Sequence, residues 1–333
     1  GDTGSMFGHS PAPVAKAIRH QARRGLTYML PTEAALEAGR LLTDRFGPFR
    51  WQIATTATDA NRFALRVARA ITGKPKVLVF NGCYHGTVDD TFVSLENGRT
   101  IPSPGLLGQV NDLTQTAVCA EFNDLASVEA ALAQGDVAAI LTEPVMTNSC
   151  MVLPEAGFHD GLRQLSKKYG ALLIIDETHT ISSGLGGYTR VHSLRPDIFV
   201  VGKCVAGGMP TAVWGLTEET AKRYHEADAK REPGRTGMGT TLSANPMQFA
   251  CLVATLSEVM TPENYAHMEK LAERLSHGLA RVIDTHKAPW HVVRVGARVE
   301  FICAPGPLKN GTEAGLAHQP QVEAAIHTGL INR

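Results

Sequence analysis

A carboxylate and a lysine stand at the ends of two predicted strands. The run Ala171-Leu-Leu-Ile-Ile-Asp176 is typical of a buried strand ending in a carboxylate, and Asp197-Ile-Phe-Val-Val-Gly-Lys203 of one ending in a lysine. Ligands of doubly wound sheets bind outside the carboxyl ends of strands, so we expect both groups to face one crevice. There the lysine can form an imine with an aldehyde, and the carboxylate can keep a pyridine nitrogen protonated. A lone strand-end aspartate is usually a cap and a lone lysine is usually solvated; the pair is informative.

Two further segments fit a ligand that carries a phosphate and an aromatic ring. The segment Thr56-Ala57-Thr58-Asp59 begins a predicted helix, and the N–H groups and dipole of a helix N-terminus suit a phosphate. Thr56 and Asp59 also fit a capping box, so an ordinary capped helix is the alternative. In Asn81-Gly82-Cys83-Tyr84-His85-Gly86, glycines flank Tyr84 on a predicted strand-end loop, which suits stacking on a ring better than packing in a core.

Three more segments complete the set of candidate site residues. Glu143 ends another predicted strand and precedes a proline, and His179 comes three residues after Asp176. A neutral imidazole at His179 can donate a hydrogen bond to a phenolate oxygen. Thr241 lies in Thr240-Thr241-Leu-Ser-Ala-Asn-Pro246, which also reads as a plain helix start at Asn245.

Together these motifs resemble the class III aminotransferases of pyridoxal-phosphate (PLP) fold type I, and within them the branch similar to glutamate-1-semialdehyde aminomutase. The resemblance spans roughly Phe7 to Met260. It implies that Lys203 carries PLP as a Schiff base and that Asp176 contacts the ring nitrogen. It further implies that Tyr84 stacks on the ring and that Glu143 lies near the cofactor face or the substrate entrance.

The same resemblance implies a site shared between two subunits. His179 stands where many members have a glutamine that contacts the ring hydroxyl, and Thr241 stands where the family threonine reaches the phosphate bound in the neighbouring subunit. We therefore expect a homodimer. Ala57 replaces a family glycine, which changes the space beside the phosphate. Thr178 replaces a family valine, which changes the space behind the ring.

The rest of the chain fits an α/β fold, a large domain with a mostly parallel, seven-stranded-type sheet and a smaller α+β domain. Apolar runs predict buried strands, and apolar residues at three- and four-residue spacing predict helices between them. The strands are predicted at Lys76–Phe80, Ala138–Thr142, Ala171–Ile175, Ile198–Val201 and Ala212–Trp214. The helices are predicted at Asp59–Ile71, at Glu155–Tyr169 and from Pro246.

The domain boundaries follow from changes in this pattern. We expect residues 1–30 to contribute to the small domain and the site entrance, 31–285 to form the large PLP-binding domain, and 286–333 to form the C-terminal small domain, with antiparallel strands from about residue 290. Flanking sequence, including an arginine for a substrate carboxylate, is expected outside this chain.

Composition excludes several classes of partner. The 333 residues carry no formal net charge and no Lys/Arg-rich run, which disfavours a nucleic-acid partner. No apolar run approaches the ~20 residues that span a bilayer, so no membrane partner is expected. Six scattered cysteines without a CxxC pair indicate reduced thiols and a cytoplasmic protein. His85 has no second ligand at a suitable spacing, so no metal site is expected, and Gly184-Leu-Gly-Gly-Tyr188 is not a dinucleotide fingerprint.

Three functions remain open. The first is transamination, from an amino donor (a β-amino or aromatic amino acid is compatible) to an oxo acid or aldehyde. The second is intramolecular 2,1-aminomutation of a semialdehyde of the glutamate-1-semialdehyde type. Ala212-Val-Trp-Gly215, where aminomutases usually show Tyr/Phe-Gly-Gly, favours transamination. The third, a non-catalytic binding protein, predicts loss of Lys203 or Asp176, and both are present.

Overall fold

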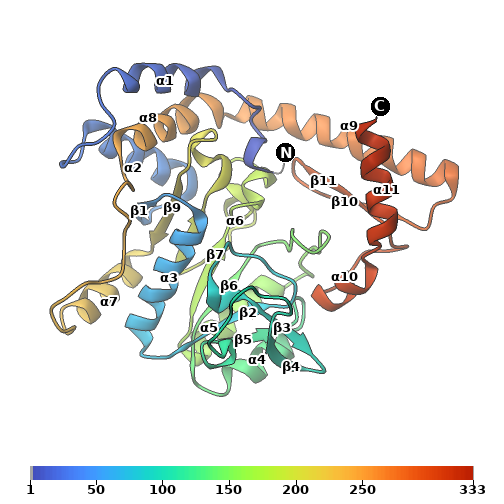
Figure 1. The fold of residues 1–333 in the computed structure, drawn as a ribbon, viewed down its shortest axis with the longest axis horizontal. Coiled ribbons are helices and arrows are strands. Elements are labelled where there is room, and N and C mark those ends of the chain that lie inside the picture. The colour runs from blue at the N-terminus through green and yellow to red at the C-terminus, as the bar shows by residue number, and fades with distance from the viewer. Residues whose placement is uncertain (1–2, 333) are drawn as a thin grey trace.

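A central β-sheet organises the protein, whose computed structural model describes residues 3–332 (Figure 1). Within this range seven strands form one sheet in the order β1-β9-β8-β7-β6-β2-β5. Only β9 runs against its neighbours, so the sheet is mostly parallel, as predicted. The strands are β1 (Arg50–Ala54), β2 (Lys76–Phe80), β5 (Ala117–Ala120), β6 (Val137–Thr142), β7 (Leu172–Asp176), β8 (Ile198–Val201) and β9 (Ala212–Leu216).

Helices cover both faces of this sheet. Alternate residues of one strand reach different cores: Val79 of β2 packs in the core beneath α3, and Leu78 packs in the core beneath α4 and α5. A further core joins α1, α2 and α8 to β8 and β9. The helices up to residue 254 are α1 (Ala12–Ala22), α2 (Glu33–Phe46), α3 (Ala57–Thr72), α4 (Leu125–Leu132), α5 (Phe158–Tyr169), α6 (Gly187–Val191), α7 (Glu218–Asp228) and α8 (Pro246–Ala254).

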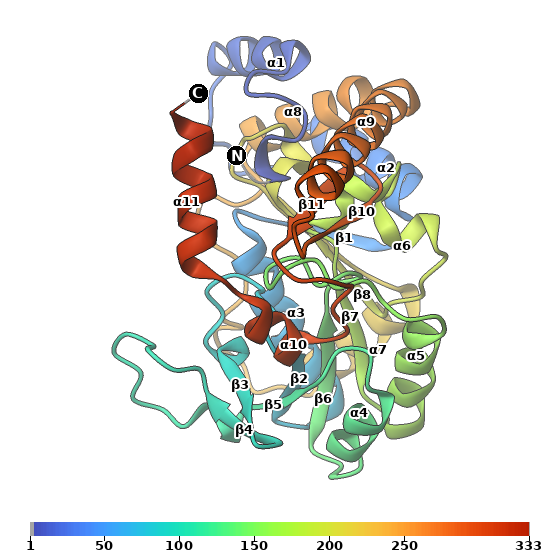
Figure 2. The ribbon, with the colours of Figure 1, turned by 90° about the vertical axis from the view of Figure 1, so that its right-hand side faces the viewer.

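The C-terminal elements lie to one side of the sheet (Figures 1 and 2). The long helix α9 (Pro262–His286) leads into an antiparallel hairpin of β10 (His291–Val295) and β11 (Arg298–Ile302). Two helices follow, α10 (Gly311–Ala317) and α11 (Pro320–Ile331). The strands expected near residue 290 are therefore confirmed. The division into domains at residues 30 and 285 stays a prediction, and Gly1, Asp2 and Arg333 lie outside the described residues.

Local signals set most of the helix ends, with two differences from prediction. The N-cap Asn245 and Gln248 form a capping box at α8. Thr56 caps α3 by accepting from the Asp59 N–H, but the Asp59 carboxylate binds the Thr56 hydroxyl instead of its backbone, so the predicted capping box is only half formed. The predicted start of α5 at Glu155 was three residues early, because Gly157 with φ +82° forms the N-cap.

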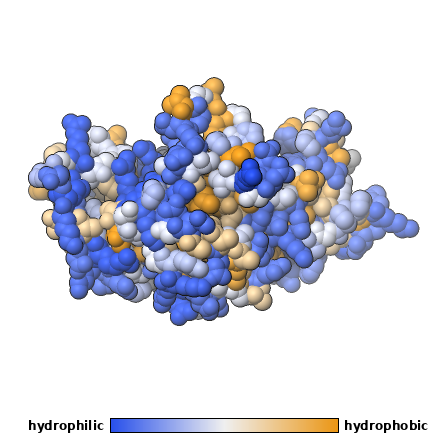
Figure 3. Space-filling view, turned by 90° about the horizontal axis from the view of Figure 1, so that it is seen from below, coloured by the Kyte–Doolittle hydropathy of each residue, from blue (hydrophilic) through white to orange (hydrophobic). Residues whose placement is uncertain are grey.

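The surface seen from below is mostly hydrophilic, with scattered hydrophobic residues (Figure 3). Outside the central sheet, β3 (Val93–Glu96) pairs with β4 (Arg99–Pro102) in a smaller antiparallel ribbon. Between residues 3 and 332, no helix combines the length and apolar character that crossing a bilayer requires. The same residues contain no His/Cys/Asp/Glu cluster suited to a metal ion, and the six cysteines are unpaired.

Candidate active site

The carboxyl ends of the parallel strands converge on one cavity of about 300 Å³, a size within the range of small-molecule sites. Each contributing loop follows a parallel strand: β1, β2, β6, β7 or β8. Of the predicted site residues, those that line the cavity are Thr56, Ala57, Thr58, Tyr84, His85, Glu143, Asp176, His179 and Lys203. The structure thus brings these nine residues together around one cavity, including Asp176 and Lys203, which the strand-end rule predicted to share a crevice.

Asp176 is buried at the end of β7 and accepts three hydrogen bonds. Its Oδ2 accepts from Asn61 Nδ2 at 2.8 Å and contacts His85 Nδ1 at 2.9 Å, and its Oδ1 accepts from the Thr178 N–H at 3.1 Å. Burial alone would raise the pKa of Asp176, but these bonds and the His85 charge lower it to about 2. Asp176 is therefore an anion throughout the physiological range.

His85 is fully buried beside this carboxylate. Burial alone would lower the pKa of His85, but Cys83 and Asp176 beside it raise that pKa well above its usual value. Asn61 also donates to the His85 carbonyl oxygen at 3.1 Å and so holds the loop that carries the histidine. His85, Asp176 and Asn61 form one hydrogen-bonded unit, of which His85 and Asp176 line the cavity.

Lys203 begins a short 3₁₀ turn directly after β8, with its backbone in the left-handed region at φ +47°. Non-glycine residues rarely adopt this conformation, and at functional sites it marks a position that the surroundings force. Gly202 before it donates its N–H to Thr178 Oγ1 at 3.2 Å. The hydroxyl that replaces the family valine thus has a partner, and it ties the lysine loop to the end of β7.

The first turn of α3 closes the other end of the cavity. First-turn N–H groups lack partners within their helix, so Ala57 and Thr58 present an anion-binding end to the cavity. Space for the Ala57 methyl group comes from Gly202, where an added Cβ would approach the Ala57 Cβ at 2.9 Å. Gly86, with φ +81°, leaves room for Thr58, whose hydroxyl accepts from the Thr87 N–H at 3.1 Å.

Glu143 is a second buried carboxyl in the wall of the cavity. It accepts from the Thr147 hydroxyl and, at 3.4 Å, from Asn148 Nδ2. Burial raises the pKa of Glu143 to about 7, and the neighbouring His85 only partly opposes this effect. Glu143 and Asp176 therefore differ strongly in acidity, although they line the same cavity.

Tyr84 and His179 both line the cavity and differ in exposure. Tyr84 is 44% exposed at the cavity wall, as expected of a ring that contacts a ligand rather than a core. His179 is buried, and its Nδ1 lies 3.0 Å from Arg298 Nη1 and 3.1 Å from Thr3 Oγ1. Arg298 comes from β11, so the hairpin contacts the cavity lining through this residue.

Thr241 is the one predicted site residue that does not line the cavity. It is exposed and lies in the segment before α8. The neighbouring Ser243 contacts Thr55 Oγ1 at 3.0 Å, which holds the segment near the cavity mouth.

Sequence reasoning missed Asn61, Thr147 and Arg298. Of these, only Asn61 could have been noticed in the sequence, because it is a polar amide among the apolar residues of the buried face of α3.

Comparison with known proteins places this geometry in a family. The family model "Aminotransferase class-III" matches residues 3–330. The chain belongs to the class III aminotransferase family. A class III relative from Bacillus thuringiensis (strain Al Hakam), glutamate-1-semialdehyde 2,1-aminomutase 2, is 32% identical, with 98% of this chain and 76% of the relative covered.

Solved class III structures share the fold over nearly the whole chain. A glutamate-1-semialdehyde-aminomutase from Pseudomonas aeruginosa PAO1 is 48% identical with a TM-score of 0.96, covering 99% of this chain and 74% of that one. Another structure with this name and source was solved in complex with PMP. An omega-transaminase from Sphaerobacter thermophilus is 26% identical with a TM-score of 0.86, covering 96% and 74%. The protein therefore has PLP fold type I, and its cofactor is pyridoxal 5′-phosphate.

The residues present fit this cofactor. The cavity offers a buried anion with a pKa of about 2 for a protonated ring nitrogen, and the N-terminus of a 16-residue helix for a phosphate. A lysine on the adjoining loop suits an aldehyde, and an aromatic side chain stands at the cavity wall. The cavity thus has a suitable side chain or backbone group for the ring nitrogen, the phosphate, the aldehyde and the ring face of the cofactor.

Proposed function

We propose that the protein is a transaminase that moves an amino group from an amino acid to an oxo acid or aldehyde, with Lys203 and Asp176 as its catalytic residues. The observation that supports this most is the placement of both side chains in one cavity, together with the first turn of α3. The substitution of Ala212-Val-Trp-Gly215 for the usual aminomutase pattern favours transfer to a second molecule.

Each polar side chain has a task in this proposal. Pyridoxal phosphate, when bound, supplies an aldehyde carbon and an electron-withdrawing ring. Lys203 Nζ would hold that carbon through its amine and, once free, would take the proton from the substrate Cα. The Asp176 carboxylate would keep a proton on the ring nitrogen, because it remains ionised at neutral pH. His179 would donate a hydrogen bond to the ring oxygen.

Aminomutation of a semialdehyde is the second candidate, and the relatives favour it. The B. thuringiensis and P. aeruginosa proteins compared above both carry aminomutase names. The two candidates differ in stoichiometry. An aminomutase converts glutamate-1-semialdehyde alone, whereas a transaminase consumes one amino donor for each acceptor. Incubation with the semialdehyde alone, followed by amino-acid analysis, separates them: complete conversion without a donor would exclude the two-substrate proposal.

The role of Lys203 has a direct chemical test. Borohydride reduction fixes the bond between the cofactor and its lysine, so peptide mapping of the reduced holoenzyme should label Lys203. Lys203→Ala should lose turnover by several orders of magnitude, because it removes both the binding amine and the proton carrier. Lys222→Ala, at an exposed lysine of α7, is the matched control. A label on another lysine would overturn the assignment.

We propose further that two subunits share each site. Thr241 is exposed and outside the cavity of its own chain, which supports a role at the phosphate of a neighbouring subunit. Thr241→Ala should weaken cofactor retention by about 1.5–3 kcal/mol through loss of one bond to a charged group.

Hybrid dimers of Thr241→Ala with Lys203→Ala test this arrangement. If Thr241 acts across the interface, one site of each hybrid carries both defects and the other carries neither, so activity partly recovers at limiting cofactor. Native mass spectrometry verifies that hybrids form. If hybrids form and no activity recovers, Thr241 does not act in the neighbouring site.

A further inference from the structure

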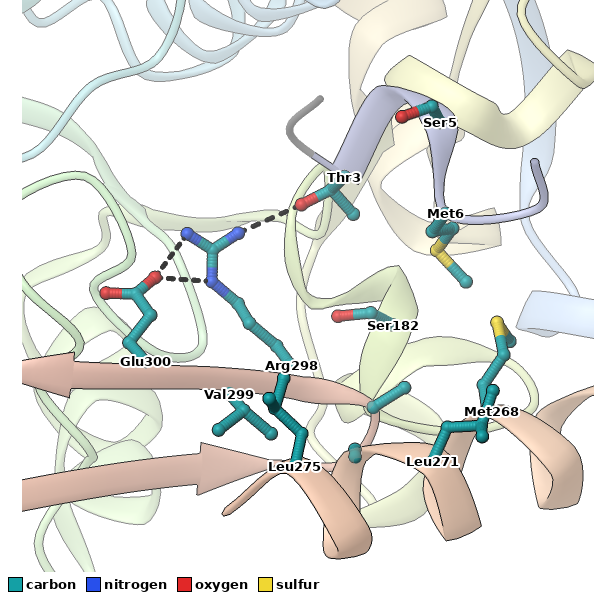
Figure 4. A pocket seen from close by; sticks show the side chains of 12 residues that line it. Thr3, Ser5, Met6, Ser182, Met268, Leu271, Leu275, Arg298, Val299 and Glu300 are labelled. Carbon is teal, nitrogen blue, oxygen red and sulfur yellow. Dashed lines mark hydrogen bonds and ion pairs between the residues drawn. The ribbon is translucent and has the colours of Figure 1, made fainter. Parts of the chain in front are cut away.

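We propose that Arg298 binds the carboxylate of the amino-acid substrate, an inference that rests on the proposed amino-group transfer. Its side chain rises from β11 above Leu275 and Val299, and its guanidinium points away from these apolar residues toward Thr3 and Glu300 (Figure 4). On this proposal the carboxylate-binding arginine lies within this chain, whereas the sequence analysis expected it in flanking sequence.

Arg298 does not itself line the cofactor cavity, but it contacts His179, which does. Nη1 lies 3.0 Å from His179 Nδ1, and Nη2 donates to the Thr147 carbonyl oxygen at 3.1 Å. His179 lines the cavity itself, and the Thr147 side chain donates to Glu143, which also lines it. A planar guanidinium at this junction presents the paired donors that a carboxylate accepts.

The contact with His179 also fixes which ring nitrogen carries the proton. A guanidinium has only donors, so His179 Nδ1 must accept from Arg298, and the proton of the neutral imidazole then lies on Nε2. That tautomer is the one that can donate from Nε2 to the ring oxygen of the cofactor. Arg298 therefore orients His179 through Nη1, whereas Nε and Nη2, which donate to Glu300, are the donors that a substrate carboxylate would take over.

Glu300 is the counter-ion that a substrate carboxylate would replace. Its Oε1 accepts from Arg298 at 2.6 and 2.9 Å (Figure 4). The Glu300 side chain is 27% exposed, so it can turn to water without an unpaired buried charge. One carboxylate then takes the place of another at the same donors, so the guanidinium keeps an anionic partner.

Equilibrium binding of simple carboxylates tests this assignment without turnover. Butanoate and 3-phenylpropanoate are titrated calorimetrically into the holoenzyme, each against the alcohol of the same carbon skeleton. The wild type should bind each acid more tightly than its alcohol. Arg298→Gln should lose this preference by about 10- to 100-fold, and Arg298→Lys should restore part of it. Glu300→Gln should bind the acids more tightly, since it removes the competing carboxylate.

Arg294→Gln is the matched control, because Arg294 lies on the same hairpin and donates to the carbonyl oxygens of Gly296 and Glu269. It should keep the wild-type preference. If Arg298→Gln keeps the preference, or if the wild type shows none, Arg298 does not bind the substrate carboxylate. Partial recovery of the acid preference in Arg298→Lys would show that misfolding is not the cause of its loss in Arg298→Gln.

A separate measurement distinguishes failure of the proposed function. 3-Phenylpropylamine has an amine but no carboxylate, and exchange of this amine at Lys203 should shift the visible absorption of the holoenzyme in the wild type and in Arg298→Gln alike. No shift in either protein would contradict the proposed amino-group chemistry. A shift in both, with the acid preference unchanged by Arg298→Gln, would contradict only the role of Arg298.

Discussion

Asp176→Asn should destabilise the apoprotein and slow turnover more than it weakens cofactor binding. The substitution keeps the shape of the side chain but replaces two acceptor oxygens by one oxygen and one amide nitrogen. With its nitrogen at the Oδ1 position, the amide faces the Thr178 N–H; with its nitrogen at Oδ2, it faces Asn61 Nδ2 and His85 Nδ1. Either rotamer leaves at least one buried donor without an acceptor.

The size of the stability loss in Asp176→Asn can be derived in two ways. An unsatisfied buried donor costs about 1–3 kcal/mol. The pKa of Asp176 is lowered from 3.8 to about 2, a shift that corresponds to roughly 2 kcal/mol. A carboxyl with a lowered pKa stabilises the fold above its unfolded value, and this contribution is lost as pH falls from 3.8 toward 2. The full loss in Asp176→Asn should therefore be seen at neutral pH.

Urea unfolding of the apoprotein at pH 7 measures this loss, with Asp89→Asn at an exposed aspartate as control. Turnover is then measured at saturating cofactor, so that weaker binding does not contribute. The variant should be about 1–3 kcal/mol less stable than the wild type, and its turnover should fall by more than its cofactor affinity. An unfolding free energy within 0.5 kcal/mol of the wild type, about the size of an ordinary surface effect, would refute the stability argument. Normal turnover would show that another group holds the ring nitrogen proton.

Three more outcomes follow from neighbouring residues. Burial raises the pKa of Glu143 to about 7, so the stabilising contribution of its protonated form is present below pH 4.5 and is lost as pH rises through 7. Glu143→Gln should therefore reduce the change in unfolding free energy between pH 5 and 8 by about 3 kcal/mol, measured by urea unfolding. An unchanged pH slope would contradict this. Gly86→Ala places a Cβ 2.2 Å from Thr58 Oγ1 at φ +81°; it should lower both the melting temperature and the cofactor affinity, and wild-type values for both would argue against a tight approach. Asn61→Ala should lower the free energy of unfolding by about 1–3 kcal/mol. In a double-mutant cycle with Asp176→Asn, the two losses should be non-additive because the side chains share a hydrogen bond. Strictly additive losses would contradict an energetic coupling between the two residues.

The buried strands and the strand-end loops were predictable because burial on both faces leaves a clear apolar signature. Lys76–Phe80 and Ile198–Val201 are strands with these bounds. The strand β1 (Arg50–Ala54) was missed, since Arg-Trp-Gln-Ile-Ala is partly exposed at the sheet edge and lacks a continuous apolar run. β5 (Ala117–Ala120) was missed because four mostly small residues give a weak pattern.

The loop residues of the site were predictable for a different reason: parallel strands bring their carboxyl ends to one edge. Arg298 could not be found this way, because it lies 119 positions from His179 and meets it only when the hairpin packs against the sheet. Its own strand shows an arginine two residues before a glutamate, as many exposed hairpins do. The half-formed capping box at Thr56 has a local origin instead, since Asp59 binds the Thr56 hydroxyl rather than its backbone N–H.

The left-handed backbone of Lys203, at φ +47°, has a consequence for protein engineering. For a residue with a side chain this conformation costs roughly 1–2 kcal/mol that glycine does not incur. Selection for thermal stability alone would therefore favour Lys203→Gly over the natural residue, and so would select against the amine on which the chemistry depends. Any stabilisation programme for this protein must hold position 203 fixed, because here stability and activity demand different residues.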